Sequence, residues 1–135
     1  MSNQLRDMDK PDVIFCIGTN MTECHPVAAT RIKKALKRGA KMIVADPRKI
    51  PLAEMADAYL PLRVGSDVAL LLAMAHVINR EGLLDDAFIA DRTQGGEEFL
   101  KHLESFTPEW AAEISGLKAS EIEQAAIWYG EADRA

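Results

Sequence analysis

Three short segments of this sequence place glycine beside side chains that hydrogen-bond readily to a nucleotide. They are residues 18–25, 45–48 and 63–67. Glycine allows the main chain to approach a phosphate closely, while carboxylate and amide groups bind ribose hydroxyls and the edges of bases. Helices predicted to start after the first and third segments add main-chain N–H groups that attract anions. The chemistry predicted for these segments is therefore nucleotide binding.

Asp46 is the strongest single candidate, because it directly follows a predicted strand, where dinucleotide-binding folds place an acid that binds ribose. A purely structural interpretation stands beside each functional one. An Asp-Pro pair is a common turn opening, and Gly18 can simply end a strand. Ser66 and Asp67 can cap a helix without binding any ligand. The residue types alone leave both interpretations open.

Metal binding and nucleophilic catalysis are not expected. Cys24 adjoins His25, but a metal site needs three or four ligands, and the other histidines lie on predicted helices without a ligand partner at helical spacing. Two cysteines are too few for an iron–sulfur cluster or a disulfide framework. The sequence has no serine-histidine-aspartate order, no Gly-x-Ser-x-Gly turn and no Gly-Lys-Ser/Thr phosphate loop. No residue is therefore assigned a catalytic or metal-binding role.

The elements that carry these segments alternate between strand and helix. Three strands are expected, at residues 13–17, 42–45 and 58–62. The first is an apolar run of the kind that parallel sheets bury on both faces, and the second ends at residues 46–48, where proline removes a main-chain donor. Pro26 is placed to start a helix that ends before Gly39, and residues 50–56 favour a short helix. In such sheets, ligands bind beyond the carboxyl ends of the strands, where the three segments lie.

The second half of the chain is predicted to be helical. The turn at residues 65–67 leads into a helix that is expected to run to about residue 81, and it is apolar almost all round from residue 68 to 78, which predicts that it is buried. Thr107 is placed to cap a helix that Gly116 ends, and Ser120 with Glu123 forms a capping box for the last helix. The expected fold class is α/β, a Rossmann-like three-layer αβα arrangement with a mostly parallel sheet plus C-terminal helices. The 135 residues predict a single domain, with a nucleotide-binding core at 12–82 and a helical extension at 83–135.

The charge and the apolar content of the sequence disfavour nucleic acid and membranes as partners. Sixteen basic and twenty-one acidic residues give a net charge of −5, which disfavours binding to nucleic acid. The longest apolar run, residues 68–75, is far shorter than the roughly 20 residues that span a bilayer, so no membrane contact is expected. The sequence does not open on a secretory leader, which favours a cytoplasmic location.

An ordinary nicotinamide dinucleotide site is weakly indicated. A Gly-x-Gly-x-x-Gly turn would follow the first strand in such a protein, and only Gly18 is present at that place. A free-standing Rossmann-like module for NAD(P) or another nucleotide therefore remains an alternative rather than the leading interpretation.

Taken in order, the motifs closely resemble the molybdopterin oxidoreductases, and specifically the catalytic subunit of formate dehydrogenases. The motifs are Gly18-x-Asn20-x-x-Glu23-x-His25-Pro26, Asp46-Pro47-Arg48, Leu60-Pro61-Leu62, Gly65-Ser66-Asp67, Thr107-Pro108-Glu109-Trp110 and Ile114-Ser115-Gly116. The resemblance covers residues 13 to about 130. Each motif is weak alone, and the ordered set is specific.

The resemblance implies that the chain is a fragment. In that family a much longer subunit holds molybdenum or tungsten between two pyranopterin guanine dinucleotides, with an iron–sulfur cluster in an N-terminal domain. This chain resembles the Rossmann-like domain that binds the guanosine-diphosphate end of one molybdopterin guanine dinucleotide. The implied partners are the rest of the catalytic subunit and electron-transfer subunits.

The resemblance also assigns roles to individual residues. Gly18, Asn20, Glu23 and Cys24 would line the diphosphate and nucleotide, Asp46 and Arg48 the ribose and phosphate region, and Gly65 and Asp67 the guanine edge. A carboxylate such as that of Asp67 can accept two hydrogen bonds from guanine.

Two positions depart from the family pattern: Cys24 stands where serine or alanine is usual, and Ser66 where threonine is common. The family's metal-ligating cysteine or selenocysteine, its catalytic histidine and its cluster cysteines have no counterpart, and His25 matches a structural His-Pro pair. The isolated chain is therefore expected not to oxidise formate. A nitrate or dimethyl-sulfoxide reductase is a weaker third interpretation.

Overall fold

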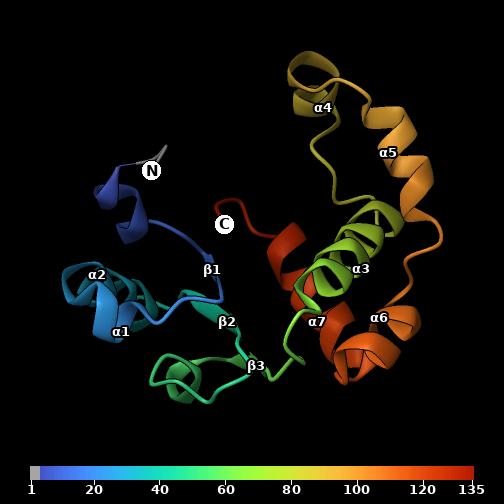
Figure 1. Cartoon of the computed structure of the whole chain (residues 1–135). Coiled ribbons are helices and arrows are strands. Elements are labelled where there is room, and N and C mark those ends of the chain that lie inside the picture. Colours follow the sequence, from blue (N-terminus) through green and yellow to red (C-terminus); the bar gives the residue numbers. More distant parts are fainter. Residues whose placement is uncertain (1–3) are drawn as a thin grey trace. The chain divides into compact units, whose positions relative to one another are not determined.

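The computed structural model describes residues 4–135, which form two compact units (Figure 1). The first unit contains the chain up to Pro61 together with Ala132–Ala135, and the second contains Leu62–Glu131.

A three-stranded parallel sheet forms the centre of the first unit. Its strands are β1 (Val13–Ile17), β2 (Lys41–Ala45) and β3 (Ala58–Leu60), in the spatial order β1-β2-β3. Val13 pairs with Lys41, and Ile43 pairs with Ala58. The parallel α/β organisation and the Rossmann-like fold class are thereby confirmed. The third strand ends two residues before the predicted end at residue 62.

Helix α2 (Pro26–Lys37) connects β1 to β2 and begins at the predicted proline. The short helices of this unit are η1 (Leu5–Asp9), α1 (Met21–Cys24) and η2 (Ala53–Met55). The helix predicted at residues 50–56 is thus a single 3₁₀ turn. Ile32 of α2 belongs to the same buried cluster as Cys16 of β1 and Val44 of β2. This apolar contact fixes α2 against the sheet and holds β1 and β2 in place at their carboxyl ends.

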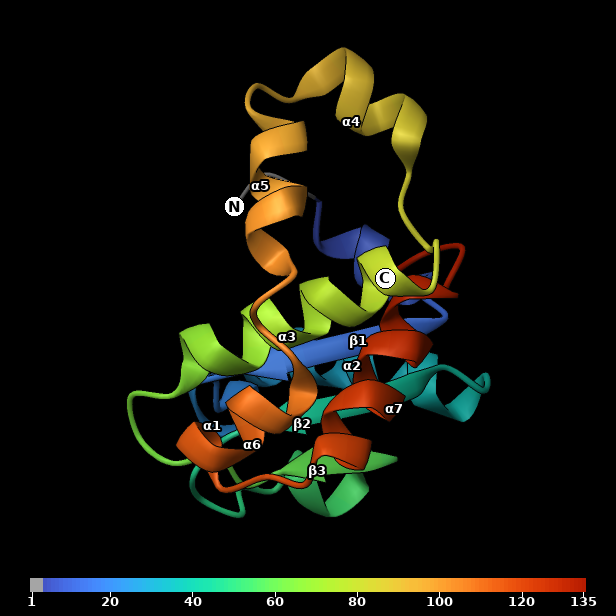
Figure 2. The same cartoon turned by 90° about the vertical axis from the view of Figure 1, so that its right-hand side faces the viewer.

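The second unit is helical and consists of α3 (Asp67–Arg80), α4 (Asp86–Arg92), α5 (Gly96–Leu103), α6 (Pro108–Ser115) and α7 (Ala119–Gly130). Figure 2 shows α6 and α7 beside α3, which contacts both of them and α5. Leu70 and Val77 of α3, Ala111 of α6 and Ile122 of α7 are fully buried. Within the described residues, no helix is long and apolar enough to cross a membrane.

Two predictions about these helices are wrong. Helix α3 is not buried all round, because its neighbours cover one face and leave Val68 67% and Leu71 44% exposed. Ser120 does not cap the last helix. The carboxylate of Glu121 accepts the main-chain N–H of Lys118 at 3.1 Å, so that α7 begins at Ala119. The division into a 12–82 core and an 83–135 extension stays a prediction.

Candidate nucleotide-binding residues

Gly18 directly follows β1 and turns the chain out of the sheet. Its main-chain N–H donates to the carbonyl of Ala45 at 3.1 Å, which continues the pairing of β1 with β2 by one residue. Its φ of +57° lies in the left-handed region that glycine adopts readily. Apart from its two chain neighbours, no described residue has a heavy atom within 4 Å of the place where a Cβ would stand. The left-handed backbone at this position therefore favours glycine, and the missing side chain leaves open space beside the main chain.

Asn20 and Thr22 carry buried polar atoms that have no hydrogen-bond partner among residues 4–135. These atoms are Oδ1 of Asn20 and Oγ1 of Thr22. The main-chain carbonyl of Asn20 accepts the N–H groups of Glu23 and Cys24, whereas its side chain does not cap α1. A buried acceptor left unpaired costs about 1–3 kcal/mol, so a ligand that supplies a donor here gains affinity.

Thr22 was not among the residues predicted from the sequence. It stands at an unspecified position of the first motif, and only the structure shows that its hydroxyl, on the short helix α1, is buried.

Glu23 and Cys24 lie on α1 and are exposed. The thiol of Cys24 is free, and among the described residues the Glu23 carboxylate has no ion pair or hydrogen bond. Because α1 ends at Cys24 and α2 begins at Pro26, both side chains lie close to the start of the longer helix.

Asp46 directly follows β2, and its main-chain N–H donates to the carbonyl of Leu60 at 3.3 Å. The residue is only 5% exposed. Its Oδ1 accepts the main-chain N–H of Arg48 at 2.8 Å, and the guanidinium of Arg48 is directed largely into solvent. Burial, together with the negative charge of Asp46, raises the pKa of Tyr59.

The structure brings the first six candidates to one edge of the sheet. Ile17 and Ala45 are paired in the register of β1 and β2, so Gly18 and Asp46 leave neighbouring parallel strands at the same end. The remaining members of this group follow within a few residues; they are Asn20, Glu23, Cys24 and Arg48.

Gly65 and Asp67 belong to the second unit and lie together at the start of α3. Gly65 has a φ of +85°, with open space where a Cβ would stand. Asp67 is the first residue of α3 and is exposed. Ser66 is buried, and its hydroxyl donates to the carbonyl of Arg63 instead of capping the helix. Within the described chain, the Asp67 carboxylate makes no hydrogen bond or ion pair, so no local contact occupies it.

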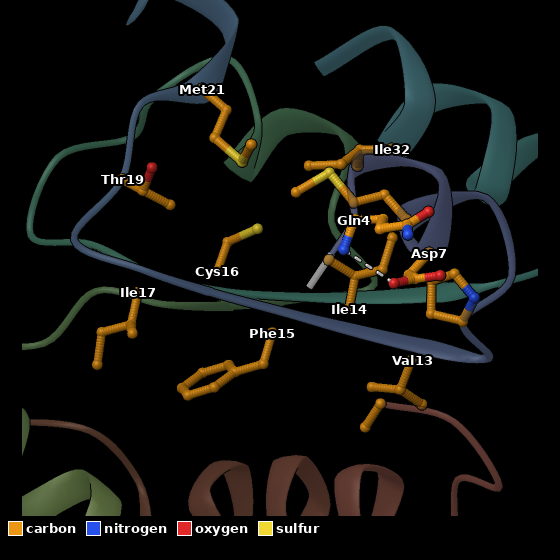
Figure 3. Close-up of a pocket in the computed structure, with 13 residues that line it drawn as sticks. Gln4, Asp7, Val13, Ile14, Phe15, Cys16, Ile17, Thr19, Met21 and Ile32 are labelled. Carbon is orange, nitrogen blue, oxygen red and sulfur yellow. Dashed lines mark hydrogen bonds between the residues drawn. The ribbon is translucent and has the colours of Figure 1, made fainter. Parts of the chain in front are cut away.

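A separate cavity of about 400 Å³ in the first unit contains none of the eight candidates (Figure 3). Its wall is largely apolar. Ile14 and Cys16 point to the side of β1 on which Met21 and Ile32 lie, and burial raises the pKa of Cys16 to about 11. Its polar lining residues include Gln4, Asp7 and Thr19, and the Asp7 carboxylate already accepts the main-chain N–H of Gln4 at 3.0 Å.

Comparison with known proteins defines the class of protein. Residues 1–132 match the family described as molybdopterin oxidoreductase. The whole chain is 47% identical to formate dehydrogenase H of Escherichia coli strain K12 and covers 19% of that protein. It is 44% identical, again over its whole length, to a formate dehydrogenase alpha subunit of Methanococcus maripaludis, of which it covers 20%.

A solved structure agrees with these relatives. The acetylene hydratase from Pelobacter acetylenicus superposes with a TM-score of 0.83 and 40% identity, over 89% of this chain and 17% of that one. The chain therefore belongs to the molybdopterin oxidoreductase family, whose members are enzymes. It spans about a fifth of the length of the curated relatives that it matches.

The family implies a molybdenum or tungsten pterin cofactor, and the residues present fit the nucleotide part of such a group. Oδ1 of Asn20 and Oγ1 of Thr22 offer unpaired polar atoms, and Gly18 leaves the main chain accessible. The exposed guanidinium of Arg48 can pair with a phosphate. These are donors and acceptors for a diphosphate and a ribose.

Proposed function

We propose that this chain is the domain of a formate dehydrogenase-like molybdoenzyme that binds the guanosine-diphosphate part of molybdopterin guanine dinucleotide. When bound in the complete enzyme, the cofactor supplies the metal centre for the two-electron oxidation of formate to carbon dioxide. The residues of this chain would bind and orient the nucleotide end. The chain itself would carry out no step of the redox reaction.

The observation that carries this proposal is the position of the Asp67 carboxylate, which is exposed at the start of α3. It stands at the first residue of α3, beside the left-handed Gly65, and has no partner among residues 4–135. Guanine presents N1–H and an exocyclic amine on one edge, and a carboxylate can accept from both at once. Adenine presents an acceptor at N1 and would face the carboxylate with a lone pair. Asp67 therefore favours guanine over adenine.

The residues at the sheet edge would bind the rest of the nucleotide. The accessible main chain at Gly18 and the side-chain NH₂ of Asn20, which can donate, would contact the diphosphate, while Glu23 and Cys24 would line the nucleotide. Asp46 and Arg48 would bind the ribose and phosphate region. Because one oxygen of Asp46 already accepts from Arg48, the other oxygen is the one proposed to meet a ribose hydroxyl.

The proposal extends to the complete protein. The remaining four-fifths of the catalytic subunit and electron-transfer subunits would be its partners, and the iron–sulfur cluster would lie outside this chain. Free Cys16 and Cys24 agree with the proposed cytoplasmic location, because the cytosol keeps thiols reduced. The family match over residues 1–132 disfavours the alternative of a free-standing NAD(P)-binding module.

Calorimetric titration of the 135-residue chain with GDP, GMP and ADP tests the proposal. GDP is expected to bind most tightly, since it offers both the guanine edge and the diphosphate. Asn20→Ala is expected to weaken GDP binding by roughly threefold to tenfold, because it removes the side-chain NH₂ that would donate to the diphosphate.

Gln124→Ala serves as a control, since it removes an exposed amide on α7. It is expected to leave the affinity for GDP unchanged. Tighter binding of ADP than of GDP, or no binding of GDP by the folded chain, would overturn the proposal.

A further inference from the structure

Arg63 bonds to three consecutive carbonyl groups in the last turn of α6. Its Nη1 donates to the carbonyl of Glu113 at 2.9 Å and to that of Ile114 at 3.3 Å. Its main-chain N–H donates to the carbonyl of Ser115 at 2.9 Å. The last carbonyls of a helix lack partners within the helix and carry partial negative charge, so a cation placed there is favourable.

The same residue closes the turn that leads into α3. The carbonyl of Arg63 accepts the main-chain N–H of Ser66 at 3.1 Å and its hydroxyl at 2.6 Å. The carbonyl of Ser66 then accepts the N–H of Leu70 in the first turn of α3. Gly65, in the left-handed region, allows the turn to close. Arg63 thus joins the end of α6 to the residues immediately before Asp67.

Gly116 provides the space that the guanidinium needs. It ends α6 with a φ of +78°. A Cβ on this residue would lie 3.1 Å from Nε of Arg63. The next-nearest atoms, Cζ at 3.4 Å and Nη2 at 3.5 Å, also belong to the guanidinium, so the closest contacts of an added methyl group would be with Arg63. Gly116 is therefore required both for its conformation and for the close approach of Arg63.

Helix α6 is itself firmly placed. The hydroxyl of Thr107 accepts the N–H of Trp110 at 3.3 Å, and the rings of Phe106 and Trp110 meet edge to face. The hydroxyl of Ser115, which is fully buried, donates to the carbonyl of Ala111 and accepts the N–H of Leu117. The proposed function assigned no role to the two motifs at residues 107–110 and 114–116.

We infer that Arg63 is a positioning residue for the guanine-binding carboxylate. By tying the turn before α3 to the end of α6, it fixes the main chain that carries Asp67 and so sets the preference for a guanine base over adenine. The inference rests on the proposed function, because it concerns the same base contact. It gives the motifs at 107–110 and 114–116 a role in holding the nucleotide-binding turn.

The test measures the ratio of GDP to ADP affinity by calorimetry for three variants of the full 135-residue chain. Arg63→Ala is expected to lower this ratio from about tenfold to below about threefold, with ADP affinity changed less than about twofold. Arg63→Lys is expected to give an intermediate ratio, because an ammonium reaches one carbonyl but lacks the planar fork. Gly116→Ala disturbs the same contact from the α6 side and is expected to lower the ratio as well.

Arg80→Ala is the matched control. Arg80 is an exposed arginine of the same unit that pairs with Glu81 and Glu123, away from the turn. It should leave the ratio unchanged. Hydrogen exchange supplies a second readout: the amides of Ser66 and Leu70, which bond to the turn, should exchange at least about tenfold faster in Arg63→Ala and at the original rate in Arg80→Ala.

The outcomes separate the two claims. Equal affinities of the unaltered chain for GDP and ADP would overturn the proposed function and the inference together. A selective unaltered chain with an equally selective Arg63→Ala variant would overturn the inference alone. A lost preference without faster exchange at Ser66 and Leu70 would mean that Arg63 contacts the nucleotide directly, which also contradicts a positioning role.

Discussion

The main-chain N–H of Arg48 donates to Oδ1 of Asp46 at 2.8 Å, at the carboxyl end of the central strand β2. Asp46 is almost fully buried, whereas the Arg48 side chain is 76% exposed. Asp46 can therefore both stabilise the turn and bind a ribose hydroxyl, because each role uses a different oxygen of its carboxylate. One oxygen holds the loop, and the loop presents the guanidinium of Arg48 to solvent.

Asp46→Ala should destabilise the fold. The substitution removes the carboxylate oxygen that accepts the part-buried main-chain N–H of Arg48. Leaving this donor unpaired lowers the free energy of unfolding by about 1–3 kcal/mol. Asp46→Asn retains an acceptor oxygen and should cost less. Urea denaturation of the three proteins checks the order, and an Asp46→Ala variant as stable as the unaltered chain would contradict it.

Gly18 and Gly116 should respond differently to the same substitution. Each has a positive φ, so alanine at either position incurs left-handed strain of about 1–2 kcal/mol. Only at Gly116 does the new methyl group also meet a neighbour, Nε of Arg63 at 3.1 Å. Gly116→Ala should therefore lower the free energy of unfolding more than Gly18→Ala. Equal losses in denaturant titration would show that the guanidinium moves aside at no cost.

The two cysteines should differ in their reactivity towards an alkylating reagent. Burial raises the pKa of Cys16 to about 11, so at pH 8 roughly one thiol in a thousand is ionised, whereas Cys24 is exposed. One thiol should be modified rapidly, and Cys24→Ser should abolish this fast phase. Fast modification that survives in Cys24→Ser would contradict the buried position of Cys16.

Cys16 also predicts a dependence of stability on pH. Because its pKa is higher in the folded chain than the ordinary value of 9.0, folding disfavours the thiolate. The contribution is fully present below pH 9 and is lost as the pH rises towards 11. When the free energy of unfolding is measured by urea denaturation at several pH values, Cys16→Ser should show a smaller decrease between pH 9 and pH 11 than the unaltered chain. An unchanged slope between pH 9 and 11 in this variant would assign the effect to other groups.

The isolated chain should not reduce a dye in the presence of formate, with or without added molybdate. The family's metal-ligating residue, catalytic histidine and cluster cysteines have no counterpart among these 135 residues. Turnover above that of a buffer blank would contradict the assignment of the chain to the nucleotide-binding part alone.

Local signals predicted the elements of the fold well where they were continuous. The apolar run 13–17 has the same first and last residues as strand β1, and the strand ends there because Gly18 turns the chain immediately afterwards. Pro26 marks the start of α2, and Thr107 and Gly116 mark the two ends of α6. The exposure of Val68 was not predictable, since it depends on which face of α3 its neighbours leave uncovered.

The site was predictable as a set of loops and less so as a set of contacts. The sequence placed Gly18 and Asp46 after neighbouring strands, and the register of β1 and β2 puts them at one edge. It did not indicate Thr22 of α1, because the burial of its hydroxyl depends on how that short helix is placed. Nor did it indicate the bonds from Arg63 to Glu113, which join residues fifty positions apart.

Titration of Asp67→Ala with GDP and ADP is the sharpest test of guanine recognition by Asp67. Asp86→Ala is its matched control, since Asp86 is an exposed acid at the first residue of α4 and has the same relation to its helix. The unaltered chain and Asp86→Ala should bind GDP roughly tenfold more tightly than ADP, whereas Asp67→Ala should bind both equally with its stability unchanged. Equal affinities in the unaltered chain, or a preference for GDP that survives in Asp67→Ala, would show that Asp67 does not recognise guanine.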